Sequence, residues 1–170
     1  MQEHIYTAKR SRIIKQSFFI WLYVATHIAI NIIAYPTFVH KNQIWVIIFA
    51  NTIFSLLTIP SLILFFKYYK LSVCKKFIVT YNSLKFVDDK TGNIVELKNS
   101  DIETINLVTN NRMSKLPWSF HEYFSFTDNK KNKIIVTSYF MDISDFWLDT
   151  LTRKVSSKKL ITEEKIYPII

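Results

Sequence analysis

The segment that decides the fold is residues 17–66, SFFIWLYVATHIAINIIAYPTFVHKNQIWVIIFANTIFSLLTIPSLILFF. It contains two uncharged runs, which are separated only by His40, Lys41 and Asn42. Each run exceeds the roughly 20 helical residues that cross about 30 Å of hydrocarbon. The segment therefore predicts two transmembrane helices, Ser17–Val39 and Gln43–Phe66, joined by an extracytoplasmic turn at 40–42 into an antiparallel hairpin.

Basic residues flank this hairpin and are nearly absent from its turn. Residues 1–70 carry seven Lys and Arg against one acid, and residues 71–170 carry fifteen against twelve. The flanking set is Lys9, Arg10, Arg12 and Lys15 before the first run, and Lys67, Lys70, Lys75 and Lys76 after the second. Because positively charged flanks stay in the cytoplasm, we predict that both termini are cytoplasmic, with 1–16 a basic N-terminal segment. The positive-inside bias thus accounts for most of the surplus positive charge, so this charge gives no reason to expect nucleic-acid binding.

The first run resembles a secretory signal in having a basic start. Its apolar stretch is too long for a cleavable signal and lacks a small-residue cleavage site, so the sequence predicts an uncleaved membrane anchor. Abundant Lys, Asn and Ile indicate an AT-rich bacterial genome. The predicted location is therefore the bacterial cytoplasmic (inner) membrane.

Four polar residues interrupt the apolar runs near the expected middle of the bilayer. If the hairpin folds symmetrically about Lys41, His27 faces Ser55 and Asn31 faces Asn51. An ionisable side chain at this depth is typical of a proton or ion relay. Polar side chains also join neighbouring helices by hydrogen bonds. Because the runs contain no carboxylate, we favour the second interpretation.

After the second basic cluster the apolar residues alternate with polar ones, which is typical of half-buried strands. The predicted strands are Lys76–Tyr81, Leu84–Asp88, Ile94–Lys98, Ile102–Thr109, Tyr123–Thr127 and Lys133–Phe140. An amphipathic helix follows, with Asp142 as N-cap and an apolar stripe of Ile143, Phe146, Trp147, Leu151 and Val155. We predict an α+β membrane protein in which residues 67–157 form an antiparallel β-barrel or sandwich capped by this helix. The tail, 158–170, is compatible with disorder, a docking strand or an extra barrel strand.

The sequence lacks the residues of the common enzyme sites. A single glycine, Gly92, excludes phosphate-binding glycine loops, and a single cysteine, Cys74, excludes an intramolecular disulfide. The segment at His121 and Glu122 begins like a zinc-protease motif but lacks its second histidine, so we expect His121 on the surface or on an edge strand. We predict no catalytic residue, no cofactor and no metal. The loop 112–120, which contains aromatic and basic residues, is compatible with stacking or with binding of a partner peptide. We prefer a structural interpretation, in which Trp118 anchors the loop to the strands.

The stretch FIVTYNSLKFVDDKTGNIVELKNSDIETI at 77–105 and the terminal DISDFWLDTLTRK at 142–154 carry a family resemblance. In this order of elements the chain resembles the bacterial pleckstrin-homology-like domains, in particular the YcxB-like small membrane proteins with an N-terminal helical hairpin. The resemblance implies a barrel of seven or so strands used for binding or assembly. Eukaryotic relatives hold lipid phosphates with basic residues in the loop between the first two strands, where this chain has Asn82 and Ser83, so we expect no phosphoinositide pocket there.

Three functions are compatible with these features. In the first, the chain is a non-enzymatic, membrane-anchored binding or scaffold module. Lys67, Lys70, Lys75 and Lys76 would then contact anionic lipid headgroups non-specifically, and a protein partner or a second copy would bind the strands. In the second, it is an accessory subunit of a larger membrane complex that docks through His27, Asn31, Asn51 and Ser55. In the third, an oligomer conducts protons or ions past His27.

Overall fold

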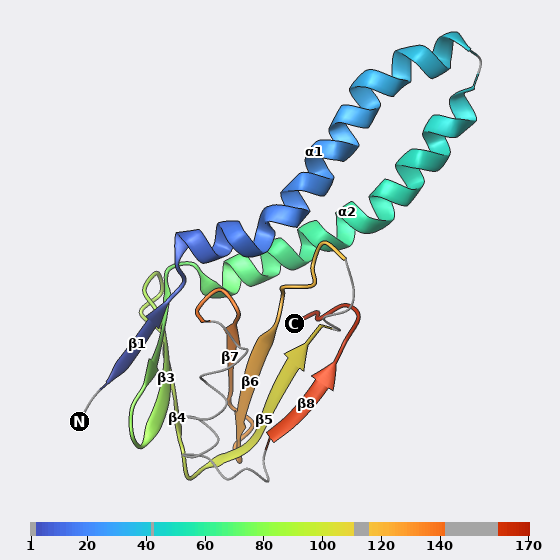
Figure 1. The fold of residues 1–170 in the computed structure, drawn as a ribbon. Helices are drawn as coiled ribbons and strands as arrows, with labels where there is room; N and C mark the ends of the chain where they lie inside the picture. The colour runs from blue at the N-terminus through green and yellow to red at the C-terminus, as the bar shows by residue number, and fades with distance from the viewer. Residues whose placement is uncertain (1–2, 42, 111–115, 142–159) are drawn as a thin grey trace.

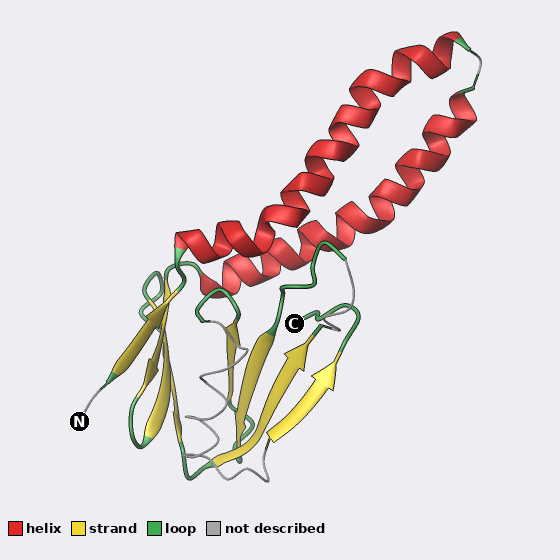
Figure 2. Cartoon of the chain, in the orientation of Figure 1, coloured by secondary structure: helices red, strands yellow, loops and turns green. Residues whose placement is uncertain are grey.

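The computed structural model describes residues 3–41, 43–110, 116–141 and 160–170. It has two long helices and two four-stranded sheets, which confirms the α+β prediction (Figure 2). The predicted C-terminal helix, including Asp142 and its apolar stripe, lies outside the described residues. Both labelled chain ends lie beside the sheets, away from the tip of the helical hairpin (Figure 1).

The two helices are longer than the apolar runs that predict them. Helix α1 spans Arg10–His40 and α2 spans Ile44–Ser72, and they lie antiparallel as a hairpin. The extra turns at the base, residues 10–16 and 67–72, contain the good helix formers Arg, Lys, Gln and Leu together with Ser, Ile and Tyr. Figure 1 shows these basal turns lying across the ends of the strands, while the remainder of both helices extends away from the sheets. Among the described residues, only these two helices are long and apolar enough to cross a membrane.

The first sheet has the strand order β1-β2-β3-β4, with every pair antiparallel. Its strands are β1 (His4–Thr7), β2 (Lys75–Val79), β3 (Ser83–Asp88) and β4 (Ile94–Lys98). Strand β1 falls in the segment that we predicted only as a basic N-terminal region, and it pairs Tyr6 with Phe77 of β2. The residues on either side of the hairpin therefore belong to one sheet.

The second sheet has the order β7-β6-β5-β8. Its strands are β5 (Ile102–Thr109), β6 (Tyr123–Asp128), β7 (Lys133–Thr137) and β8 (Leu160–Glu164). Strand β7 ends three residues before the predicted Phe140, because residues 138–140 form a turn. Strand β8 lies in the tail and pairs parallel with β5, so of the three alternatives for the tail an extra strand is the one observed for 160–164.

The two sheets pack face to face and are not joined into a closed barrel among the described residues, which corrects the barrel form of the prediction. The core between them includes Phe77, Leu84 and Leu97 from the first sheet and Phe126 and Ile134 from the second. The rings of Phe77 and Phe126 stack across the interface, with centroids 6.0 Å apart. A barrel would have removed the free strand edges, whereas β4 is an edge strand of the first sheet as far as the described residues go.

Candidate functional site

The base of the hairpin is held on the second sheet by buried polar contacts. The Gln16 Nε2 donates to the backbone oxygen of Ser138 at 3.1 Å, and the Ser138 Oγ donates to the Gln16 Oε1 at 2.8 Å. The hydroxyls of Ser72 and Thr137 are 2.6 Å apart. These contacts fix one position on each helix against the end of β7. Because buried polar groups are costly to leave unpaired, they define a specific docking geometry.

An apolar cluster surrounds these polar contacts. Leu64 and Tyr68 of α2 are fully buried against Val108, Tyr139 and Trp118. Trp118 is 6% exposed, as expected for the residue that anchors the preceding loop, while Arg112 and Lys115 of that loop lie outside the described residues. The junction between hairpin and sheets thus has a hydrophobic core of its own, separate from the core between the sheets.

His121 lies within this junction, which corrects its predicted surface or edge position. Its side chain is fully buried, its ring meets that of Tyr68 edge-to-face at 4.9 Å, and its Nε2 is 3.1 Å from the Tyr139 hydroxyl. Among the described residues, the His121 Nδ1 has no hydrogen-bond partner. Burial lowers the pKa of His121 to about 4, and burial also raises the pKa of Tyr139. The sequence around His121 gives no sign of this burial, because it depends on a helix more than fifty residues earlier.

The segment after β8 passes beneath α2 and ties it to the second sheet. The Tyr167 hydroxyl donates to the backbone oxygen of Pro60 at 2.5 Å, and the Tyr68 hydroxyl donates to that of Pro168 at 3.2 Å. The Trp118 Nε1 donates to the backbone oxygen of Ile166 at 2.7 Å. The tail is therefore part of the junction.

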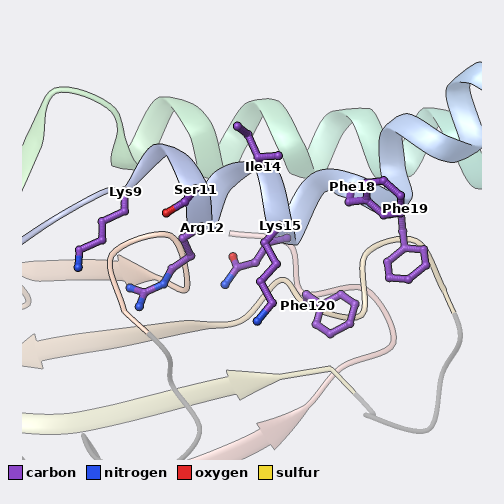
Figure 3. A pocket seen from close by; sticks show the side chains of 9 residues that line it. Lys9, Ser11, Arg12, Ile14, Lys15, Phe18, Phe19 and Phe120 are labelled. Atoms are coloured by element: carbon purple, nitrogen blue, oxygen red, sulfur yellow. The ribbon is translucent and has the colours of Figure 1, made fainter.

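A cavity of about 640 Å³ opens beside the first turns of α1 (Figure 3). Its lining residues are Lys9, Ser11, Arg12, Ile14, Lys15, Gln16, Phe18, Phe19 and Phe120. Figure 3 shows the basic side chains leaving α1 on the side of the strands, with the phenylalanines further along the helix. Phe120, in the loop before β6, stacks on Phe19 with ring centroids 5.8 Å apart. The cavity thus combines cations and aromatic rings from two distant parts of the chain.

The lysines predicted to contact headgroups lie elsewhere. Lys75 and Lys76 pair with Asp88 at 3.6 Å and Asp89 at 3.0 Å, and the Lys67 Nζ donates to the backbone oxygen of Ile170 at 3.3 Å. Lys70 is exposed near the end of α2. The pKa of Asp88 is lowered, chiefly by the hydrogen bond that it accepts from the backbone N–H of Lys90, and to a lesser extent by Lys75. Contact of these four lysines with lipid headgroups stays a prediction. The charges of Lys75 and Lys76 already have partners in Asp88 and Asp89.

The polar residues of the hairpin form one network. Asn31 and Asn51 exchange two side-chain hydrogen bonds, of 2.7 and 2.9 Å. The His27 Nε2 lies 2.7 Å from the Asn51 Oδ1, so His27 reaches Asn51 and not the predicted Ser55. Ser55 is half-buried and lines a shallow, mainly apolar crevice along α2, which Asn51 also lines. Three of the four residues therefore meet between the helices, and among the described residues no hydrogen bond joins Ser55 to them.

No group of three potential metal ligands from His, Cys, Asp and Glu occurs in the part of the chain that the structure describes. Comparison with family models gives a match to the model described as PH domain over residues 5–147, which covers both helices, β2 to β7 and all of β1 except His4. No curated protein matches the chain.

Proposed function

The chain belongs to the PH domain family, and we propose on this basis that it is a non-enzymatic binding or scaffold module, held at the inner face of a bacterial cytoplasmic membrane by α1 and α2. PH domains commonly bind lipids or proteins. Within the family we propose that it is one of the YcxB-like membrane proteins, because a hairpin of this kind precedes strands β2 to β8.

One observation carries the proposal: an exposed apolar hairpin continues directly from a base that is buried against the sheets. Along the hairpin, side chains such as Ile33, Trp45, Phe49 and Leu56 are exposed. Exposed apolar surface of this extent marks a surface that meets lipid or protein. The buried base at Leu64 makes the hairpin part of the folded unit and not a detachable segment.

The proposed orientation follows from the distribution of charge. The basic residues of α1 begin at its sheet-facing base, whereas the tip of the hairpin offers His40 and Lys41. By the positive-inside bias, the base and both sheets face the cytoplasm and the tip faces the opposite side. The free edge of β4, where Ile94 is 63% exposed, is then a candidate surface for a protein that adds a strand.

The topology can be tested with the chain's single cysteine. Cys74 is exposed at the junction of α2 and β2, so it reports the side on which the sheets lie. A matched variant, Cys74→Ser combined with Lys41→Cys, moves the thiol to the tip. A membrane-impermeant maleimide applied to intact spheroplasts should label the tip cysteine and not Cys74, and both should be labelled after lysis.

The result that contradicts this orientation is labelling of Cys74 from outside. Extraction with alkaline carbonate provides the second measurement, because an integral protein stays in the pellet. Release of the chain into the supernatant would show that the hairpin packs against protein or folds back in solution, and it would end the membrane proposal altogether.

A second function, as an accessory subunit of a larger membrane complex, is favoured by a crevice along α2. The crevice, of about 610 Å³, is lined mainly by apolar side chains, with Thr52 and Ser55 among them. Helix interfaces within membranes are enriched in such small polar residues. The crevice would thus accept a helix from a partner subunit.

The test is extraction in mild detergent followed by mass spectrometry of what elutes at a defined stoichiometry. Thr52→Leu with Ser55→Leu should release a partner that binds this crevice. Thr26→Leu is the matched control, because Thr26 and Thr52 each donate only to a backbone oxygen of their own helix, at 2.8 and 2.9 Å. A partner retained by both variants would contradict docking at this crevice.

A further inference from the structure

The rest of the protein contacts α2 within the stretch that is apolar enough to lie in hydrocarbon. Leu57 of α2 packs against the apolar cluster at the junction, and the backbone oxygen of Pro60 accepts the hydrogen bond of the Tyr167 hydroxyl. The apolar run of α2 continues beyond both contacts, because its first charged residue is Lys67. At about 1.5 Å per residue, Pro60 lies about 10 Å from Lys67 along the helix axis.

The part of α2 that precedes these contacts is too short to cross the bilayer. Residues 44–56 cover about 20 Å of the roughly 30 Å of hydrocarbon, at about 1.5 Å per residue. If the hydrocarbon begins at Ile44, the first residue of α2, it ends near Ile63, past the contacts at Leu57 and Pro60. Any tilt of the helix moves this boundary further towards the sheets. The tail next to Pro60 therefore lies at the depth where the acyl chains end.

Helix α1 gives the same boundary on its side. The roughly 20 residues that cross the hydrocarbon, counted back from His40 at the end of α1, reach Trp21. Close by, Phe19 stacks on Phe120 of the loop before β6, with ring centroids 5.8 Å apart (Figure 3). Figure 1 shows this loop reaching the hairpin at the level where the helices leave the sheets. The loop and the tail thus flank the hairpin at a similar depth.

The side chains that these two segments expose are apolar. Phe120 is 49% exposed, Ile166 is 75% exposed and Ile169 is 46% exposed, and we call these three residues the apolar rim. None of the residues 166–170 is charged. The rim continues into the exposed apolar surface of α1, because Phe120 stacks on Phe19, which is itself 42% exposed. Exposed apolar surface of this kind marks a contact with lipid or protein.

The backbone of the tail has the opposite arrangement, because each of the five carbonyl oxygens from Ile166 to Ile170 accepts a hydrogen bond within the protein. The donors are the Trp118 Nε1 and the Asn110 Nδ2 for Ile166, the Ile169 N–H for Tyr167, the Tyr68 hydroxyl for Pro168, the Tyr123 hydroxyl for Ile169 and the Lys67 Nζ for Ile170. In water a surface segment can leave such oxygens to the solvent, whereas in hydrocarbon each unpaired oxygen is costly. Outward apolar side chains with inward, paired oxygens are the arrangement that a segment in the bilayer requires.

We propose that the apolar rim is embedded in the leaflet that the sheets face, at the boundary between the lipid headgroups and the acyl chains. The partner is the phospholipid surface itself, because the rim carries no charge that would select a headgroup. This inference rests on the proposed membrane anchoring and adds a second contact to it: the second sheet sits in the bilayer surface and not above it. Amphipathic helices that lie at this boundary bury their apolar side about 5 to 10 Å deep.

The experiment measures the depth of a fluorescent label at single cysteines of the full chain. Cys74→Ser removes the native thiol, and Ile166→Cys or Phe120→Cys then adds one at the rim. Each variant is labelled in detergent with a nitrobenzoxadiazole fluorophore and reconstituted into liposomes of phosphatidylethanolamine and phosphatidylglycerol. Iodide on both sides of the bilayer quenches labels in water. A phosphatidylcholine with a nitroxide near the top of its acyl chain quenches labels at the boundary.

Two exposed residues supply the reference positions. Leu56→Cys reports the hydrocarbon, because Leu56 lies about 18 Å along α2 from Ile44, near the middle of the bilayer. Tyr81→Cys reports water, because Tyr81 follows β2 at the end that is remote from α2. Leu56 and Tyr81 are both 67% exposed, close to the 75% of Ile166, so none of these three substitutions removes a buried side chain. Thermal unfolding of each labelled variant checks that it is folded.

We expect iodide to quench the label of Tyr81→Cys and to lose most of its effect on the labels of Ile166→Cys and Phe120→Cys. The nitroxide near the top of the acyl chain should quench both rim labels more strongly than the label of Leu56→Cys. A lipid with its nitroxide near the end of the chain should reverse that order. The emission of the rim labels should also shift to shorter wavelength than that of Tyr81→Cys.

Two results would overturn the inference. Iodide quenching of Ile166→Cys or Phe120→Cys as strong as that of Tyr81→Cys places the rim in water. A rim label that neither iodide nor the nitroxide lipids quench is covered by protein, such as a second copy of the chain, and not by lipid.

The label of Leu56→Cys separates this inference from the proposal on which it rests. If lipid nitroxides quench Leu56→Cys while iodide quenches the rim labels, the hairpin spans the membrane and only the embedding of the rim is contradicted. If iodide quenches Leu56→Cys, the membrane anchoring itself is contradicted.

Discussion

Burial of His121 at the junction of hairpin and sheets should make the stability of the protein depend on pH. In the unfolded chain His121 takes up a proton near its ordinary pKa of 6.5, whereas in the folded chain it does so only near a pKa of about 4. Between these pH values the unfolded state binds more protons, so the free energy of unfolding falls as the pH falls. The stabilisation is present above pH 6.5 and is lost progressively towards pH 4.

The size of the effect follows from the two pKa values. Between pH 7 and pH 5, this single histidine should lower the free energy of unfolding by about 2 kcal/mol. For a chain of this length that corresponds to a fall of roughly 4 to 8 °C in the midpoint of thermal unfolding. Intrinsic fluorescence during heating, with the protein in a non-ionic detergent, measures this midpoint at both pH values.

The double variant His121→Phe/Tyr139→Phe isolates the contribution of His121. It removes the titrating ring together with the hydroxyl that lies 3.1 Å from it, so no buried polar group is left without its partner, and the aromatic contacts with Tyr68 remain. Acidic groups elsewhere titrate equally in both proteins and cancel in the comparison. The exposed His4, replaced by Asn, is the control for loss of a histidine. Parallel pH dependence in the unmodified protein and the double variant would refute the reasoning.

Three other substitutions test the junction and the hairpin. Leu64→Ala should lower the free energy of unfolding by about 2 to 5 kcal/mol, because the side chain is fully buried and its loss leaves a cavity, and chemical denaturation measures the change. Tyr167→Phe removes the hydrogen bond to Pro60 and should cost about 1 kcal/mol, seen as faster proteolysis of the tail. Asn51→Leu removes hydrogen bonds within the hairpin and should cost about 0.6 to 2 kcal/mol, measured by unfolding in detergent, with the sheet structure unchanged in circular dichroism.

The elements that sequence patterns predict well are those whose own residues determine their structure. The apolar runs at 17–39 and 43–66 predict the helices because no other structure accommodates so long a run without charge. Strands Ile94–Lys98 and Ile102–Thr109 have the predicted bounds, since polar turn residues stand on either side of each. In these segments the local preference and the tertiary environment agree.

The elements that the sequence does not predict, β1, or leaves as one of several alternatives, β8, depend on distant partners. The strands HIYT and LITEE are short and largely exposed, so they carry no apolar alternation. Strand β8 forms against β5, more than fifty residues earlier in the chain, and its parallel pairing leaves no hairpin turn to mark it. Their pairing is decided by the edges that the other strands leave free, which a local pattern does not contain.

The α1 cavity was missed for a related reason. In the sequence, Lys9, Arg12 and Lys15 indicate membrane topology, which depends on charge alone. Their three-residue spacing on a helix that continues into Phe18 and Phe19 does indicate a surface with cations at one end and rings at the other. What it does not indicate is the wall formed by Phe120, which comes from a loop about a hundred residues later in the chain and stacks on Phe19.

The connections between hairpin and sheets determine how the proposed module would work. Two residues join β1 to α1, and two residues, Val73 and Cys74, join α2 to β2, so the hairpin is attached to one sheet at both of its ends. The second sheet holds the same helices through Thr137 and, by the tail, through Tyr167. A flexible linker would let a domain search a wide volume above the membrane. Four short attachments instead fix the orientation of the sheets relative to the helices. A partner at the β4 edge would therefore meet a surface that already has one orientation, and binding would not have to restrict a mobile domain.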